Sequence, residues 1–168
     1  MNEVLDLLVR AVLIGVGATV VMDLWAVFLK RCVGIASLDF AMVGRWIGHL
    51  PRGHFVHDAI ARAAPVPGER ALGWAAHYAI GVVFAIVLLA IVGPGWARQP
   101  SLLPAVLFGI VTVVAPFFVL QPGLGAGIAA SKTPKPTTAR LRSLMTHTVF
   151  GVGLFLSAWL VAMAFRLM

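Results

Sequence analysis

The stretch AVLIGVGATVVMDLWAVFL, residues 11–29, decides the fold class of this chain. It is almost continuously apolar, and as a helix it is long enough to cross the roughly 30 Å hydrocarbon core of a bilayer. A membrane-spanning strand would alternate polar and apolar residues, which this stretch does not do. The sequence therefore predicts a transmembrane helix over about residues 7–29.

Three further stretches have the same character, over about residues 71–92, 102–120 and 144–165. Of the 168 residues, 61% are hydrophobic and 11% are charged, which is too little polar surface for a water-soluble domain of this size. We expect an all-α, integral membrane four-helix bundle that forms a single membrane domain over residues 1–168.

The loops between the predicted spans differ in length and charge. Long loops over residues 30–70 and 121–143 hold ten of the 13 Lys and Arg residues, and the other three are Arg10, Arg98 and Arg166. Positive residues concentrate on the cytoplasmic side of membrane proteins. This bias predicts that both long loops lie in the cytoplasm and that both termini lie on the opposite side of the membrane. Because the basic residues lie next to the predicted spans, the net charge of +7 indicates contact with anionic lipid headgroups and not with nucleic acid.

The first long loop contains SLDFAMVGRWIGHL, residues 37–50, which has the pattern of a short helix. Phe40, Val43, Trp46 and Ile47 share one face of it, and Ser37 is the expected N-cap. Such a helix either lies at the membrane interface or packs on the bundle. We expect a short interfacial helix in this loop.

The chain also contains an internal similarity. The stretches AVLIGVGATVVMD (11–23) and AVLFGIVTVVAP (105–116) match at seven positions when one residue is skipped, and the second and fourth spans share the pattern His-x-x-x-Gly-Val. This favours two tandem, related helical hairpins. Chance similarity between helices rich in small residues is the alternative.

Polar residues recur at one depth near the predicted cytoplasmic face. Asp23, His77 and His147 each lie five to seven residues from a basic residue at a span end, which is about 7–10 Å at the helical rise. Gln121 closes the third span on the same side, and Pro116 leaves a nearby carbonyl without its helical donor. We expect these polar side chains to form one site.

Small residues accompany the polar ones at a spacing of four, which places them on the same helix face. The lines are Gly15, Thr19 and Asp23; His77 and Gly81; and His147 and Gly151. Because small residues let helix backbones approach closely, these faces are expected to point into the bundle. Gly81 and Gly151 then clear space beside each histidine, for a neighbouring helix or for a bound ligand.

Three interpretations of the predicted site stay open. Asp23, His77 and His147 bind or move a proton or a divalent metal ion; or they only lock the bundle through hydrogen bonds; or His77 and His147 are the axial ligands of a b-type haem. The haem interpretation is the weaker of the two cofactor interpretations. Four helices are few for a translocation path, so transport would imply a homodimer.

No catalytic residue is predicted, because the chain has no G-x-S-x-G motif and no defensible Ser, His and Asp arrangement. The stretch HLPRGHFVHD, residues 49–58, holds three histidines and an aspartate. Its spacing matches no strong metal-ligand motif, so we expect a solvated surface there. An enzymatic activity is therefore not the expected function.

Four motifs give the chain a family resemblance: ATVVMDLW, PGERALGWAAHYAIG, APFFVLQPGLGAGIAASKTPKP and RLRSLMTHTVFG. Together they resemble the bacterial inner-membrane proteins known as domain of unknown function 2938, over nearly the whole chain. The resemblance implies a small multi-pass bacterial membrane protein and carries no activity, substrate or cofactor. The motifs include Asp23, His77, Gln121 and His147.

Overall fold

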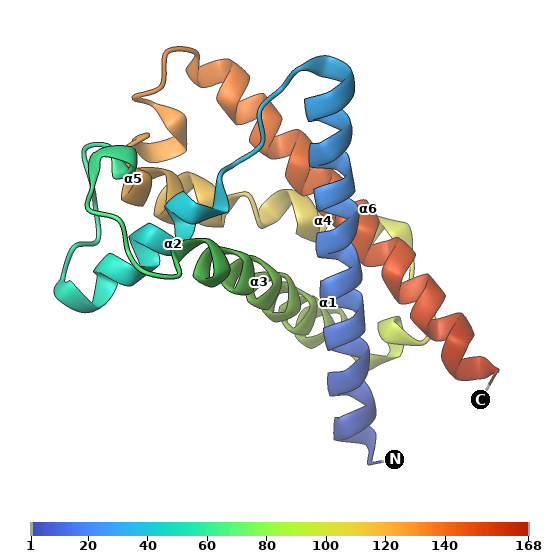
Figure 1. The fold of residues 1–168 in the computed structure, drawn as a ribbon. Helices are drawn as coiled ribbons and strands as arrows, with labels where there is room; N and C mark the ends of the chain where they lie inside the picture. The colour runs from blue at the N-terminus through green and yellow to red at the C-terminus, as the bar shows by residue number, and fades with distance from the viewer. Residues whose placement is uncertain (1, 168) are drawn as a thin grey trace. The chain divides into compact units, whose positions relative to one another are not determined.

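The computed structural model describes residues 2–167, and no strand occurs among them (Figure 1). Four helical stretches in this part of the chain are long and apolar enough to cross a membrane. They cover Glu3–Val33, Glu69–Val92, Leu102–Leu124 and Pro136–Arg166. The predicted all-α class with four spans is therefore confirmed.

The helices follow one another along the chain, joined by turns and loops of different length. The α-helices are α1 (Glu3–Phe28), α2 (Phe40–His49), α3 (Glu69–Val92), α4 (Leu102–Val111), α5 (Gln121–Leu124) and α6 (Pro136–Arg166). The 3-10 turns are Leu50–Arg52, Ile60–Arg62, Pro94–Ala97 and Ile128–Ala130, and the π-helical turns are Leu29–Val33 and Pro116–Leu120.

Two spans begin earlier than the sequence predicts, and local chemistry explains both starts. The side chain of Asn2 accepts a hydrogen bond from the N–H of Val4, and two acidic residues in the first turn suit the helix dipole, so α1 starts at Glu3. Pro136 opens α6, where a missing N–H costs nothing. Part of the predicted second loop is consequently helical.

The third span is interrupted after α4. Pro116 has no N–H to donate to the carbonyl of Thr112, and that carbonyl accepts instead from Ala115 at 3.1 Å. A widened π-helical turn over Pro116–Leu120 follows, and α5 extends the span to Leu124. The expected disturbance at Pro116 is thus present, and the span is longer than residues 102–120.

The short helix in the first loop is present as α2, but its cap differs from the prediction. The carboxylate of Asp39 accepts from the N–H of Ala41 at 3.0 Å, so Ser37 is not the N-cap. Asp39 precedes the first helical residue, where an acceptor satisfies a free backbone donor. The predicted helix is confirmed and the predicted cap is wrong.

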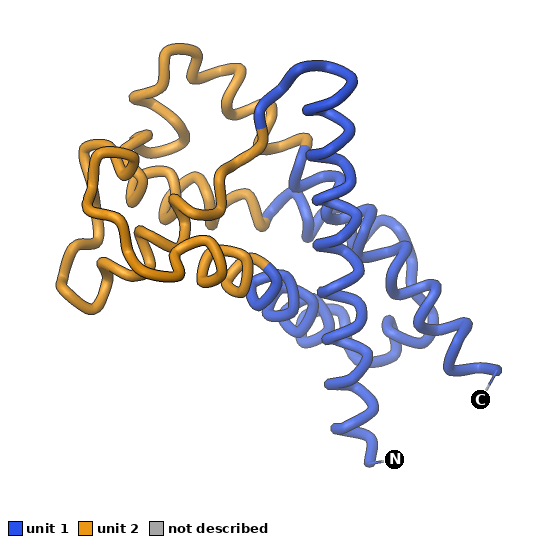
Figure 2. Tube along the Cα trace, viewed as in Figure 1, with its two compact units in different colours: residues 1–36, 78–111, 146–168 blue, residues 37–77, 112–145 orange. Residues whose placement is uncertain are grey.

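The described chain forms two compact units (Figure 2). Unit 1 comprises residues 2–36, 78–111 and 146–167, and unit 2 comprises residues 37–77 and 112–145. Unit 1 contains segments of all four spans. Its core consists of small and aliphatic side chains together with two aromatic residues: Ala11, Ile14, Ala18, Ala85, Leu88, Leu89, Trp96, Ala97, Ala105, Phe150, Leu154 and Ala158.

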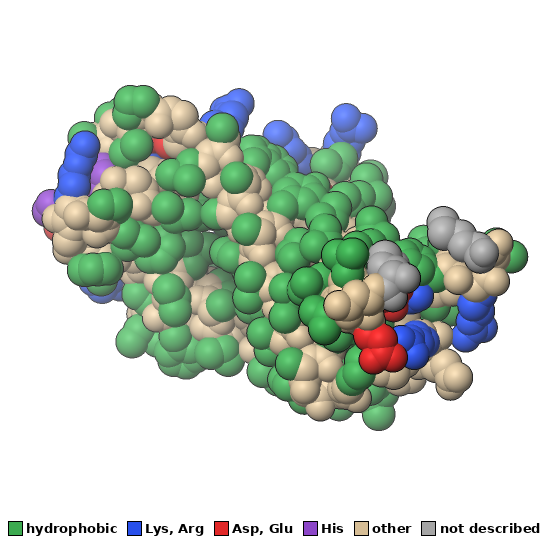
Figure 3. All heavy atoms as spheres, turned by 90° about the horizontal axis from the view of Figure 1, so that it is seen from below, with side chains coloured by type: hydrophobic (Ala, Val, Ile, Leu, Met, Phe, Trp, Pro, Cys, Tyr) green, Lys and Arg blue, Asp and Glu red, His purple; other side chains and the backbone are tan. Residues whose placement is uncertain are grey.

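Large apolar side chains are also exposed on the outside of the helices. Leu24, Ile91 and Leu103 are 63%, 69% and 68% exposed. Figure 3 shows hydrophobic side chains over much of the visible surface. Exposure on this scale suits contact with lipid tails and not with water.

Candidate functional site

A hydrogen bond between two spans is the central polar contact of unit 1. The hydroxyl of Tyr78, on α3, donates to the carboxylate of Asp23, on α1, at 2.9 Å. Both side chains are half-buried. Spacing along the sequence singled out Asp23 and the neighbouring His77 but missed Tyr78. The one signal for it was that Tyr78 is the only tyrosine of the chain and lies in an otherwise apolar span.

The approach of α1 to α3 is set by a crossing of two glycines. A Cβ added to Gly15 would lie 2.5 Å from the Cα of Val82 and 2.7 Å from the carbonyl oxygen of Gly81. The hydroxyl of Thr19 donates to the carbonyl of Gly15 at 2.8 Å and fills the space above Gly81. Asp23 lies one turn beyond Thr19, so the close crossing brings its carboxylate within reach of α3.

The second hairpin has an equivalent crossing between α4 and α6. A Cβ on Gly109 would lie 2.5 Å from the Cα of Gly151, and a Cβ on Gly151 would lie 2.7 Å from the carbonyl oxygen of Ala105. The ring of His147 forms a hydrogen bond with the backbone of Gly109. The predicted small-residue lines are therefore helix contacts.

This packing decides what the glycines make room for. At Gly81 and at Gly151 the cleared space is filled by the neighbouring helix. A haem between the helices would need that space for its macrocycle. The haem interpretation thus loses the feature of the sequence on which it rested.

His77 belongs to unit 2, in an aromatic cluster between α2 and the start of α3. Its ring centroid lies 4.3 Å from that of Phe40 and 5.8 Å from that of Trp74. Gly44 and Gly73 let the two helices meet, since a Cβ on Gly44 would lie 2.7 Å from the nitrogen of Gly73. The close approach of α2 to α3 thus packs the His77 ring against aromatic neighbours.

Gln121 also belongs to unit 2. Its Nε2 donates to the hydroxyl of Ser143 at 3.3 Å. Its Oε1 is buried and has no hydrogen-bond partner within the described chain. A buried acceptor without a donor is unusual in folded proteins.

The four residues predicted to form one site are therefore held in different ways. Asp23 and His147 belong to unit 1, whereas His77 and Gln121 belong to unit 2. Over residues 2–167 no group of three or more His, Cys, Asp and Glu side chains is arranged to hold a metal ion. The common site stays a prediction, and the contact between Asp23 and Tyr78 is an observed hydrogen bond of one of its residues.

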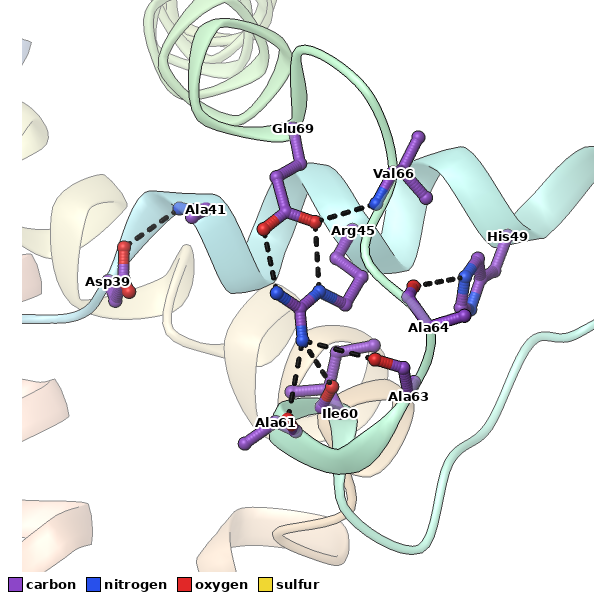
Figure 4. Close-up of polar contacts among 10 residues, drawn as sticks. All are labelled: Asp39, Ala41, Arg45, His49, Ile60, Ala61, Ala63, Ala64, Val66 and Glu69. Carbon is purple, nitrogen blue, oxygen red and sulfur yellow. Dashed lines mark hydrogen bonds and ion pairs between the residues drawn. The ribbon is translucent and has the colours of Figure 1, made fainter.

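Unit 2 contains a polar network that the sequence pattern did not predict (Figure 4). Arg45, on α2, is only 8% exposed, and its Nε and Nη2 donate to the two carboxylate oxygens of Glu69 at 2.8 and 2.7 Å. Accepting these bonds, Glu69 raises the pKa of Arg45 above its ordinary value. Nη1 faces three carbonyls of the loop: Ile60, Ala61 and Ala63. The network ties the first loop to the start of α3.

Two histidines of the first loop, the buried His49 and the half-buried His57, form a second polar group. Nδ1 of His49 lies 2.8 Å from Nε2 of His57, and the outer ring nitrogens face the carbonyls of Ala64 at 3.0 Å and Gly123 at 3.1 Å. His49 is 7% exposed, so the prediction of a solvated surface is wrong for this residue. His54 is exposed, as expected.

Which ring nitrogens of His49 and His57 donate and which accept depends on the tautomer of each imidazole.

The comparisons with known proteins agree with the sequence motifs. The family model described as "Protein of unknown function (DUF2938)" matches residues 12–161. The chain therefore belongs to this family, as the resemblance indicated. Neither the curated proteins nor the solved structures contain a match to the chain.

Proposed function

We propose that this member of the DUF2938 family is a bacterial inner-membrane protein that binds and releases a proton at Asp23, inside the membrane. The observation that supports this function is the 2.9 Å hydrogen bond from Tyr78 on the neighbouring span. Asp23 lies seven residues before Lys30, about 10 Å inward along the helix. A carboxyl group at that depth is costly, and such groups usually mark proton or ion pathways.

The geometry suits both protonation states of Asp23. A carboxylate accepts the Tyr78 bond, and a carboxylate can also take up a proton. A protonated carboxyl removes the charge from the membrane and still offers an oxygen to the hydroxyl. Proton exchange therefore does not require the crossing at Gly15 and Gly81 to open.

The charge of the loops gives the orientation of the proposed path. With positively charged loops on the cytoplasmic side, the first loop faces the cytoplasm and both termini face the periplasm. Four spans give little room for a path, so we propose that the conducting form is a homodimer.

A structural role is the main alternative. The same hydrogen bond would then only lock α1 to α3, as polar side chains often do between membrane helices. A metal ion held by Asp23, His77 and His147 is the weaker form of the ion-binding proposal, because no three-ligand group is formed among the described residues.

Proton flux into vesicles tests the proposal. The purified protein is reconstituted in vesicles that contain a pH-sensitive dye, and a potassium gradient with valinomycin drives proton movement. Asp23→Asn keeps the size of the side chain and an acceptor for Tyr78 but cannot exchange a proton. Asp58→Asn is the matched control, because Asp58 is exposed in the first loop.

We expect flux with the native chain and with Asp58→Asn, and only the leak of protein-free vesicles with Asp23→Asn. Asp23 would have the structural role if Asp23→Asn gave the same proton flux as the native chain, or if the native chain gave no proton flux above the leak. Metal analysis of the same samples separates the metal form of the proposal. A stoichiometric metal that disappears when His77 and His147 are both changed to Ala would replace the proton by that ion.

A further inference from the structure

Three arginines meet around a hollow in unit 1, away from Asp23. The hollow has a volume of about 300 Å³. Arg10 comes from α1, Arg98 from the connection between α3 and α4, and Arg166 from the last residue of α6. The complete lining is Arg10, Arg98, Gln99, Ala162, Phe165 and Arg166.

Each arginine contacts a neighbour within unit 1. Arg10 is 8% exposed; its Nε donates to Asp6 at 2.9 Å, and its guanidinium lies 4.1 Å from the ring centroid of Phe165. Nη2 of Arg98 lies 4.0 Å from the same oxygen of Asp6. Arg166 donates to the backbone carbonyl of Arg98 at 3.0 Å. All three arginines line the hollow, with Arg10 buried and the side chain of Arg98 61% exposed.

The charges around the hollow do not balance. Asp6 is the one carboxylate in ionic contact with these three arginines in the described chain, and none of the lining residues is acidic. Among the described residues, three arginines and one aspartate leave the cluster with an excess of two positive charges. Guanidinium groups bind phosphate oxygens through paired N–H bonds, and Gln99 adds an amide donor.

We propose that this hollow binds a phosphate group. Its place at the ends of α1 and α6 puts it where lipid headgroups lie if both helices span the membrane. Ala162 and Phe165 provide an apolar wall beside the arginines. An anionic phospholipid and free phosphate share the required chemistry. The site is independent of proton exchange at Asp23.

Lipid binding to the delipidated protein tests the site. Native mass spectrometry in detergent compares phosphatidylglycerol with phosphatidylcholine, and calorimetry measures inorganic phosphate, so the two sources of the phosphate group are separated. The test variant is R98Q/R166Q, which leaves the bond between Arg10 and Asp6 intact. The matched control is R31Q/R62Q, because Arg31 and Arg62 are exposed and lie elsewhere.

We expect the native chain and R31Q/R62Q to prefer phosphatidylglycerol, and R98Q/R166Q to bind it roughly 30-fold more weakly. If R98Q/R166Q does not fold, R98Q alone is measured, and a weakening of about fivefold is expected. If inorganic phosphate binds to the native chain and not to R98Q/R166Q, the site is supported with free phosphate as its ligand. Equal binding of phosphatidylglycerol by the native chain and the variant, without phosphate binding, would overturn the proposal.

Discussion

The two helical hairpins of this chain share a crossing and differ beyond it. In the first, Gly15 packs against Gly81, and in the second, Gly109 packs against Gly151. These glycines occupy matching positions in the two similar stretches, as expected for related hairpins. Seven or eight residues further on, the first helix carries Asp23 at the position where the second carries Pro116.

The two hairpins share their helix packing and differ in the residues that follow the crossing. The first helix continues without interruption and presents a carboxylate to Tyr78, whereas the second breaks where Pro116 removes a backbone donor. Thr148 follows His147 in the second hairpin, at the position of Tyr78 in the first. The glycine crossing is therefore the common scaffold, and the pair of Asp23 and Tyr78 is specific to one half.

The largest expected effect concerns the crossing itself. Gly15→Ala and Gly109→Ala each place a Cβ 2.5 Å from a backbone atom of the facing helix. Each should lower the free energy of unfolding in detergent by about 1–3 kcal/mol, because the backbones must move apart. Gly95→Ala is the control, since an added Cβ meets nothing within 4 Å there. If only one of the two variants lowered the free energy of unfolding, the two crossings would not be equivalent.

Tyr78→Phe should have a smaller effect. It removes the hydroxyl that donates to Asp23, and such bonds between membrane helices contribute about 1 kcal/mol. The unfolding free energy of Tyr78→Phe is measured in the native background and with Asp23→Ala. The cost should disappear in the second background, because the partner is already absent. An unchanged cost would mean that Tyr78 acts through packing.

His57→Asn should have the smallest effect and lies in neither hairpin. An Asn side chain cannot reach both His49 and the carbonyl of Gly123, so one contact is lost. We expect a loss of about 0.5–1 kcal/mol in unfolding free energy. Hydrogen exchange should increase at residues 121–126 and stay unchanged in α1. Faster exchange in α1 would show that the first loop controls the first hairpin.

The long apolar runs made the four spans predictable, because a bilayer demands about 20 apolar helical residues. The small-residue lines likewise predicted the faces that meet at Gly15, Gly81 and Gly151. Helix ends were less predictable, because they depend on individual side chains such as Asn2 and Asp39. Starts and caps were accordingly misplaced by several residues.

The hydrogen bond from Tyr78 to Asp23 was beyond the reach of sequence spacing. Counting residues gives depth along a helix, and depth alone does not distinguish Tyr78 from its neighbour His77. Adjacent helical residues point about 100° apart, so the rotation of α3 about its axis decides whether the Tyr78 hydroxyl can reach Asp23. That rotation follows from how Gly81 packs against Gly15 and Thr19, which only the structure shows.

The most direct test of proton exchange at Asp23 uses Tyr78, the only tyrosine of the chain. Tyrosine labelled with ¹³C at Cζ gives one NMR signal, which reports the hydrogen bond of the hydroxyl. We predict that this signal shifts in a single pH-dependent transition in the native protein and in Asp58→Asn, and that the transition is absent in Asp23→Asn. A signal that does not respond to pH, or the same transition in Asp23→Asn, would contradict the account.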